Sequence, residues 1–134
     1  MTGTIGRSMT AGQALVEFAL ILPLLILILM GIFDLGRAFY AYSVVANAAR
    51  EGARAGVIAT ATDADIRAAV RRYAIGLEPI PDSKITIMPG GSRTSGGIVV
   101  VKVEYDFTAV TPLIDTFLPN GKLTLSSTAT MRVE

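Results

Sequence analysis

Cysteine and histidine are both absent from the 134-residue chain. Their absence excludes thiol nucleophiles, disulfides, imidazole bases and the usual ligands of a zinc site. The remaining polar residues form no GxSxG elbow, no phosphate-binding loop and no cluster of acids with metal-binding spacing. The sequence therefore predicts no catalytic residue, no metal and no cofactor, and an enzyme is the less favoured class of function.

Neither positive nor negative charge predominates in the chain. Lys and Arg number 12 against 11 for Asp and Glu, which gives a formal net charge of +1. So close a balance leaves no basic stripe for nucleic acid and no acidic tail. Nucleic acid is therefore not expected among the partners.

One stretch has almost no charge, and the rest of the chain is organised around it. Residues 12–33 read GQALVEFALILPLLILILMGIF, with no charged side chain from Phe18 to Phe33. As a helix those positions span about 24 Å, which is short of a bilayer core of about 30 Å. Including residues 14–16 closes the gap and brings Glu17 to the hydrocarbon edge. The stretch predicts one membrane-spanning helix.

An unpaired carboxylate at that depth costs a few kcal/mol, so Glu17 needs an explanation. In one interpretation its side chain reaches back to the lipid headgroups. In the other, the chain is cut after Gly12, so that Gln13 becomes the amino terminus and Glu17 the fifth residue. The new ammonium group and the carboxylate would then lie one helical turn apart, and the helix dipole would also favour the charged acid.

A short polar leader ending in Gly, followed by an apolar helix with Glu at its fifth position, resembles the processing signal of type IV pilin-like precursors. More narrowly, residues 12–56 are similar to the N-terminal signature of TadE-like proteins, pilin-like components of tight-adherence (Tad, or Flp) pilus systems. The combination of VEFAL, Pro23 and NAAREGAR carries this resemblance, and the closing TLSSTATMRVE is similar to the family's usual ending.

The resemblance implies a structural subunit. A prepilin peptidase would cut between Gly12 and Gln13 on the cytoplasmic face, and Glu17 would set the register of assembly. Pro23 should kink or loosen the helix, and in this family such a flexible point would help the subunit leave the bilayer. The implied partners are that peptidase, other pilin-like subunits, inner-membrane assembly proteins and the lipid bilayer.

The resemblance also bears on the type of subunit. The family's major Flp-type pilin is much shorter and lacks a globular domain, so the domain in this chain implies a minor pilin or pseudopilin. The alternative is a permanently membrane-anchored extracytoplasmic binding domain that is never processed.

The chain divides into a leader at 1–12, a long helix at 13–57 whose N-terminal half is transmembrane, and a small extracytoplasmic domain at 58–134. Arg7 is the only charge of the leader, so the positive-inside rule places the leader in the cytoplasm. The result is a single-pass inner-membrane protein, and incorporation into a pilus after processing stays open. A secretory signal cut at the Ala46–Ala48 pattern is disfavoured because that site lies too far from the apolar core.

Helical spacing continues beyond Phe33 in a stripe of mostly small residues. Small side chains let another backbone approach closely, either the domain's own sheet, which we favour, or a second subunit. The stripe consists of Ala38, Ala41, Tyr42, Val45, Ala48, Ala49, Gly52 and Gly56.

A second, shorter helix is expected to begin at Thr62, which with Asp65 forms a capping-box pair. It should end near Ile75, with Gly76 as the residue beyond its cap. Its exposed face carries three arginines, which a solvated surface explains better than binding of phosphates or lipid headgroups. The arginines are Arg67, Arg71 and Arg72, and the expected buried residues are Ile66, Ala69, Val70 and Tyr73.

Three segments alternate apolar and polar residues as half-buried strands do: 84–88, 98–107 and 122–134. The expected inward positions are Ile85, Ile87, Val99, Val101, Val103, Tyr105, Phe107, Leu123, Leu125, Ala129, Met131 and Val133. One apolar face per strand predicts an antiparallel sheet covering a helix on one side and meeting water on the other. The fold class is therefore α+β, and the resemblance implies that it is pilin-like.

Two loops join these strands. Residues 89–97, PGGSRTSGG, are too rich in Gly and Pro to form a packed element, so we expect a flexible hairpin loop. Residues 108–122 contain Leu113, Ile114, Phe117 and Leu118 between two prolines. A connection with that much apolar surface should cover an open end of the core, or else form a contact patch for another subunit.

Overall fold

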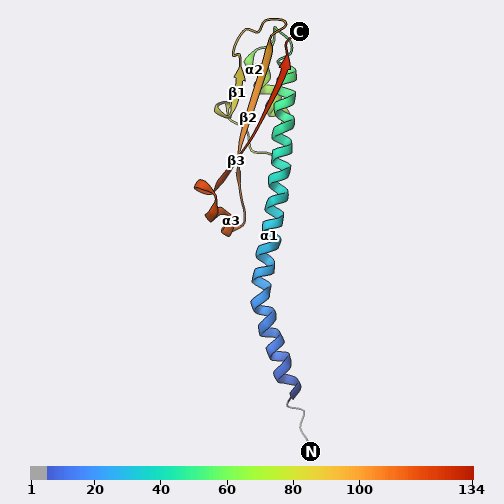
Figure 1. Cartoon of the computed structure of the whole chain (residues 1–134), viewed down its shortest axis with the longest axis vertical. Coiled ribbons are helices and arrows are strands. Elements are labelled where there is room, and N and C mark those ends of the chain that lie inside the picture. The colour runs from blue at the N-terminus through green and yellow to red at the C-terminus, as the bar shows by residue number, and fades with distance from the viewer. Residues whose placement is uncertain (1–5) are drawn as a thin grey trace, which may run out of the picture.

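The computed structural model describes residues 6–134, so the first five residues of the predicted leader lie outside the described part. One very long helix leads into a small domain with a three-stranded sheet (Figure 1). The elements in chain order are α1 (Gly6–Ala55), α2 (Asp63–Tyr73), η1 (Asp82–Lys84), β1 (Ile85–Met88), β2 (Ile98–Thr108), α3 (Pro112–Phe117), η2 (Pro119–Gly121) and β3 (Lys122–Arg132).

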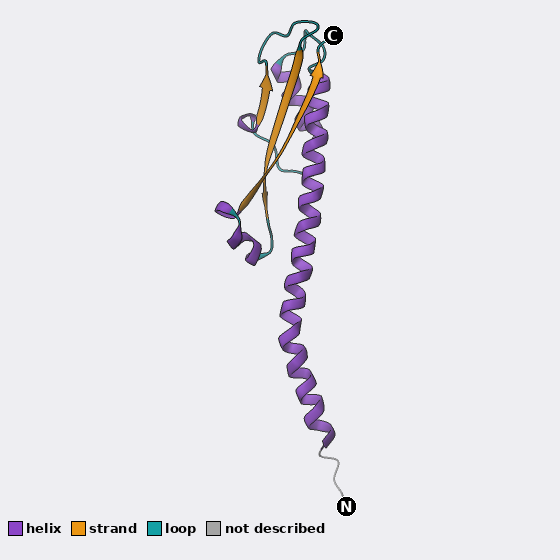
Figure 2. Cartoon of the chain, in the orientation of Figure 1, coloured by secondary structure: helices purple, strands orange, loops and turns teal. Residues whose placement is uncertain are grey.

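Helix α1 contains 50 residues and is about 75 Å long. Its C-terminal half runs along the domain, while its N-terminal half projects alone (Figure 2). The helix begins at Gly6, inside the segment predicted as a leader, and ends at Ala55. It continues through Pro23 as one element.

The sheet has the order β1-β2-β3, and both neighbouring pairs are antiparallel. Ile85 pairs with Val103 in the first ladder, and Ile98 pairs with Arg132 in the second. Together with α1 and the shorter α2, this sheet confirms the predicted α+β architecture.

The core lies between the sheet, α2 and the C-terminal half of α1, and its α1 side is built from small residues. A Cβ added at Gly52 would lie 2.5 Å from the Val70 side chain, and one at Gly56 would lie 2.8 Å from Ile66. The small-residue stripe therefore packs against the protein's own domain, as expected. Tyr42 is the exception, since it is 49% exposed.

Helix α2 begins as predicted. Thr62 is its N-cap, and the reciprocal bonds between Thr62 and Asp65 form a complete capping box. The helix ends at Tyr73 rather than near Ile75, because the backbone of Ala74 leaves the helical region (φ −79°, ψ 47°). The Ala74 amide makes the last helical hydrogen bond, to the Val70 carbonyl. Tyr73 was expected to be buried but is 39% exposed; Ala74, one turn after Val70, is buried instead.

Two of the three arginines on α2 have internal partners. Arg71 Nε donates to the Ile80 carbonyl at 3.2 Å, and its guanidinium also pairs with Asp82. Arg67 Nε lies 3.9 Å from the same Asp82 carboxylate. The Arg71 contacts join α2 to η1, whereas among the described residues Arg67 makes only this long ion-pair contact.

The strands bury their predicted faces unevenly. Val99, Val101 and Val103 are fully buried, whereas Leu123 was expected to point inward but is 41% exposed. The start of β3 and the end of β2 diverge from α1 in Figure 1, so the helix covers the sheet less completely there. At the other end the chain closes tightly, because the Glu134 amide donates to the Val57 carbonyl at 2.8 Å.

Candidate functional site

The N-terminal half of α1 has no covering layer. Residues 11–29 are all exposed, and Leu15, Leu20 and Leu24 keep between 60% and 75% of their surface accessible. The helix is long and apolar enough to cross a membrane. Burying this surface in water-free surroundings would be strongly favourable, so α1 is a candidate membrane span.

Gln13 and Glu17 lie on one face of this exposed half. Gln13 Nε2 donates a hydrogen bond to Glu17 Oε1 at 3.2 Å, across four residues. The spacing from Gln13 to Glu17 therefore brings the two side chains together on one face of the helix. Gly12 precedes them in open space, with no heavy atom within 4 Å of an added Cβ. Cleavage between Gly12 and Gln13 stays a prediction.

Pro23 lies six residues beyond Glu17, inside the apolar stretch and inside α1. Its ring supplies no amide donor, so the helix lacks one internal hydrogen bond at this point. The predicted role of Pro23 as a kink or flexible point remains a prediction.

Asp34 is the first charged residue after the apolar stretch, and it binds the far end of the chain. It is only 3% exposed. Its carboxylate accepts hydrogen bonds from the Val110 amide at 3.0 Å and from the Thr111 amide at 2.7 Å. Arg37 donates to the same carboxylate at 3.1 Å and lies over the Phe107 ring. Asp34 thus fastens the connection between β2 and β3 to α1.

Sequence reasoning did not identify this role of Asp34. The available signal was a lone acid directly after an uncharged run, followed by an arginine one turn later. Its partners lie 76 and 77 residues away and donate through backbone amides, which no side-chain motif reveals.

The connecting segment, residues 109–118, packs partly on the domain. Ile114 and Leu118 contact a small cluster of Ala41, Phe107 and Ala109, which confirms for these two side chains the expected cover over the end of the core. The side chains of Leu113 and Phe117, part of the same expectation, lie outside what the structure describes. Val110, in the same segment, is 59% exposed and does not belong to this cluster.

Beside this segment is an apolar hollow of about 250 Å³. It lies at the junction of the candidate span and the connection between β2 and β3. Its lining residues are Ile26, Leu29, Met30, Phe33, Val110 and Thr111.

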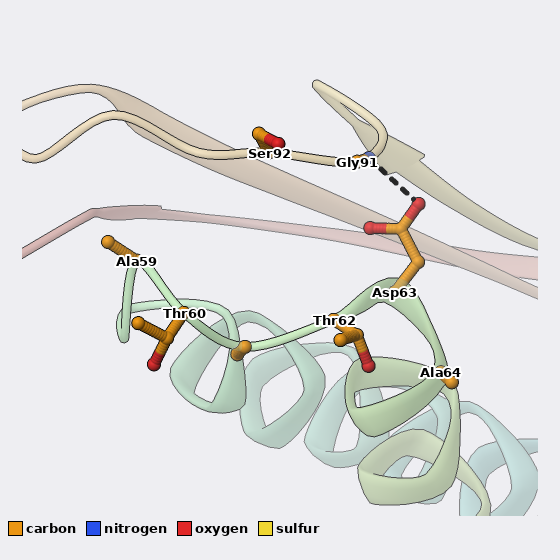
Figure 3. Close-up of a pocket in the computed structure, with 8 residues that line it drawn as sticks. Ala59, Thr60, Thr62, Asp63, Ala64, Gly91 and Ser92 are labelled. Carbon is orange, nitrogen blue, oxygen red and sulfur yellow. Dashed lines mark hydrogen bonds between the residues drawn. The ribbon is translucent and has the colours of Figure 1, made fainter.

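A larger depression of about 650 Å³ lies at the other end of the domain, between the start of α2 and the loop after β1. Asp63 accepts a hydrogen bond there from the Gly91 amide at 3.0 Å (Figure 3). Its second oxygen pairs with Arg93, whose guanidinium also donates to the Ala61 carbonyl at 2.6 Å. These polar groups bind one another and hold the loop in place.

Arg93 corrects one expectation. Residues 89–97 contain no helix or strand, as expected, but the loop is not simply a flexible hairpin connection, because the Arg93 side chain is completely buried. Arg93 stands among Gly and Ser residues in the sequence, and nothing in that pattern indicated its distant partner Asp63.

Within residues 6–134 as described, no three His, Cys, Asp or Glu residues gather closely enough to hold a metal ion. That the chain has no catalytic residue and no cofactor stays a prediction.

Comparison with known proteins gives one match. Residues 12–54 match the family model described as TadE-like protein, which confirms over this segment the resemblance expected from the sequence. The match covers the candidate span and most of the small-residue stripe. No curated protein and no solved structure matches the chain.

Proposed function

We propose, from this TadE-like segment, that the chain is a structural subunit of a Tad/Flp-type pilus or related secretion apparatus. It is made as a membrane-inserted precursor, cut after Gly12 by a prepilin peptidase, and then extracted from the bilayer. As a minor pilin or pseudopilin it is incorporated into the fibre or helps to initiate it.

The observation that carries this proposal is the uncovered apolar half of α1 with a carboxylate near its start. Residues 11–29 are exposed throughout, so this half of the helix needs another apolar environment. A bilayer supplies one before assembly, and the packed helices of neighbouring subunits supply another in a fibre. A pilin-like subunit requires a helix whose contacts with lipid can be replaced by contacts with neighbouring subunits.

Glu17 gains a partner on processing. In the uncut chain the Gln13 side chain donates a hydrogen bond to the Glu17 carboxylate. Cleavage would add a charged ammonium group at the same position, either from the same chain or from a neighbouring subunit. Such a charge-assisted contact in apolar surroundings stabilises the acid and fixes the register between subunits.

The proposal also includes the membrane topology of the chain and its partners. The leader, with Arg7, remains in the cytoplasm, and the α+β domain lies outside the inner membrane. The chain meets the prepilin peptidase, other pilin-like subunits and the inner-membrane assembly proteins. It carries out no catalysis of its own, and it binds no nucleic acid.

Intact-mass measurement tests processing directly. Coexpression of the full chain with a prepilin peptidase should yield a product that starts at Gln13. Gly12→Leu should remain uncut, because the peptidase needs a small residue before the scissile bond. Gly36→Leu is a matched control, since neither glycine has a heavy atom within 4 Å of an added Cβ, and it should be cut like the parent.

A parent chain that keeps the mass of the Met1 start beside an active peptidase contradicts this proposal. That result would favour the alternative, a binding domain permanently anchored by an uncut span.

A further inference from the structure

The connecting segment (residues 109–118) lies level with the outer end of the apolar stretch. Ile114 Cδ1 lies 3.8 Å from the position of a Cβ at Gly31. Gly31 is about 3 Å along the helix from Phe33, the last residue of that stretch. When residues 14–33 fill the hydrocarbon core, Ile114 therefore lies at the depth where the hydrocarbon ends. Figure 1 shows α3 beside α1 and beyond the end of the sheet.

Apolar surface is continuous between the two chain segments at this level. The hollow beside the segment is lined by Ile26, Leu29 and Met30 of the span together with Val110. Val110 is 59% exposed and Phe33 is 66% exposed. The surface that would face lipid on α1 thus extends onto Val110.

The composition of the segment selects the kind of partner. Between Thr108 and Lys122 the only charged residue is Asp115. Recognition of anionic headgroups requires clustered Lys or Arg, which this segment lacks. A short apolar segment at the interface instead buries its apolar side at the boundary between headgroups and acyl chains.

We propose that the connecting segment is a second membrane contact of the precursor, with Val110 docked on the acyl chains beside α1. This inference rests on the proposed insertion of α1, because the depth of the segment is measured from that span. Asp34 holds the segment in place by binding the Val110 and Thr111 amides. The domain then rests on the bilayer surface at a fixed height.

The chain contains no tryptophan, so a single introduced Trp reports its own depth. Full-length, uncut Val110→Trp is placed in phosphatidylcholine vesicles whose acyl chains carry bromine, a fluorescence quencher. Its emission should fall, and more strongly with bromine near the headgroup than near the chain end. Leu24→Trp serves as the control within the span, and Ile98→Trp as the control at the far end of β2. These three side chains are all about 60% exposed in the parent.

Quenching at Val110 and Leu24, without quenching at Ile98, supports the proposal. Quenching at Leu24 alone overturns the docking of the segment and leaves the inserted span intact. Absence of quenching at Leu24 overturns the inserted span, and the docking with it. The two failures are therefore distinguishable.

A second experiment avoids the bulky Trp side chain, which could itself disturb the segment. The chain has no cysteine, so Val110→Cys carries a single nitroxide label in the same vesicles. Relative to labelled Ile98→Cys, it should collide more with oxygen and less with a water-soluble nickel chelate. Equal values at the two sites overturn the proposal. Protection of Val110 that increases with the protein-to-lipid ratio also overturns it, because the surface would then bind a second copy.

Discussion

Two carboxylates on α1, Glu17 and Asp34, lie in opposite surroundings. Asp34 is buried and accepts hydrogen bonds from two backbone amides and Arg37, whereas Glu17 is exposed and has the Gln13 side chain beside it. The partners of Asp34 are complete within one chain. For Glu17 we expect them to be completed by processing and by a neighbouring subunit.

Glu17→Gln should therefore separate folding from assembly. The variant removes the negative charge but keeps the shape of an exposed side chain, so the domain should fold and Gly12 should still be cut. Fibres should be lost, as counted by electron microscopy of cells that express the variant in place of the parent. Fibres in normal number would contradict a role for the charge.

Asp34→Ala should loosen the connecting segment locally. The Val110 and Thr111 amides would lose a charged acceptor, and such hydrogen bonds each contribute about 2 kcal/mol. Amide hydrogen exchange at these two residues should accelerate by about 30-fold, since 1.4 kcal/mol corresponds to a factor of ten. Asp34→Asn keeps one acceptor oxygen and should show a smaller change. Unchanged exchange in Asp34→Ala would show that Asp34 does not hold the segment.

Among the elements, the sequence predicted those that depend on local pattern. Alternation located all three strands, and Thr62 with Asp65 located the start of α2, because a capping box is a contact between neighbours in sequence. The contacts of Asp34 with the connecting segment, and of Arg93 with Asp63, were missed because they join residues distant in sequence. The exposure of Leu123 was missed because it depends on where α1 stops covering the sheet, and that of Tyr73 because Ala74 is buried in its place.

The capping box of α2 should respond to acid. The Thr62 hydroxyl and amide both donate to the Asp65 carboxylate and lower its pKa below the ordinary 3.8. A folded-state pKa below the unfolded value stabilises the helix start at neutral pH, and this stabilisation is lost as pH falls through the folded-state pKa. The Thr62 amide resonance of the full chain in micelles should therefore shift with a midpoint below pH 3.8.

Asp65→Asn is the control for that titration, because it cannot change charge. The Thr62 shift should disappear in this variant. A midpoint at or above the ordinary aspartate value in the parent would contradict the capping role of the carboxylate.

For the whole molecule, the division of α1 into a bare half and a covered half decides how processing affects stability. The small-residue stripe packs on the domain, while residues 11–29 are exposed. Removal of residues 1–12 should therefore leave the packing of the domain unchanged.

We expect the uncut and processed chains to share one thermal unfolding midpoint in the same detergent, as followed by circular dichroism. The uncut Gly12→Leu variant is the reference that passes through the same peptidase treatment. A lower midpoint after cleavage would mean that the leader contacts the domain.

The continuity of α1 has a mechanical consequence. From Asp34 to Ala55 the helix runs without a break along the sheet, and the Asp34 bonds fasten its entry into the domain. Beyond Pro23, the described part of the helix contains no further proline and enters the domain as one element. Rotation of the helix between Pro23 and Asp34 therefore turns the whole domain with it, and the rotation between successive subunits would fix the orientation of each domain on the outer surface of a fibre.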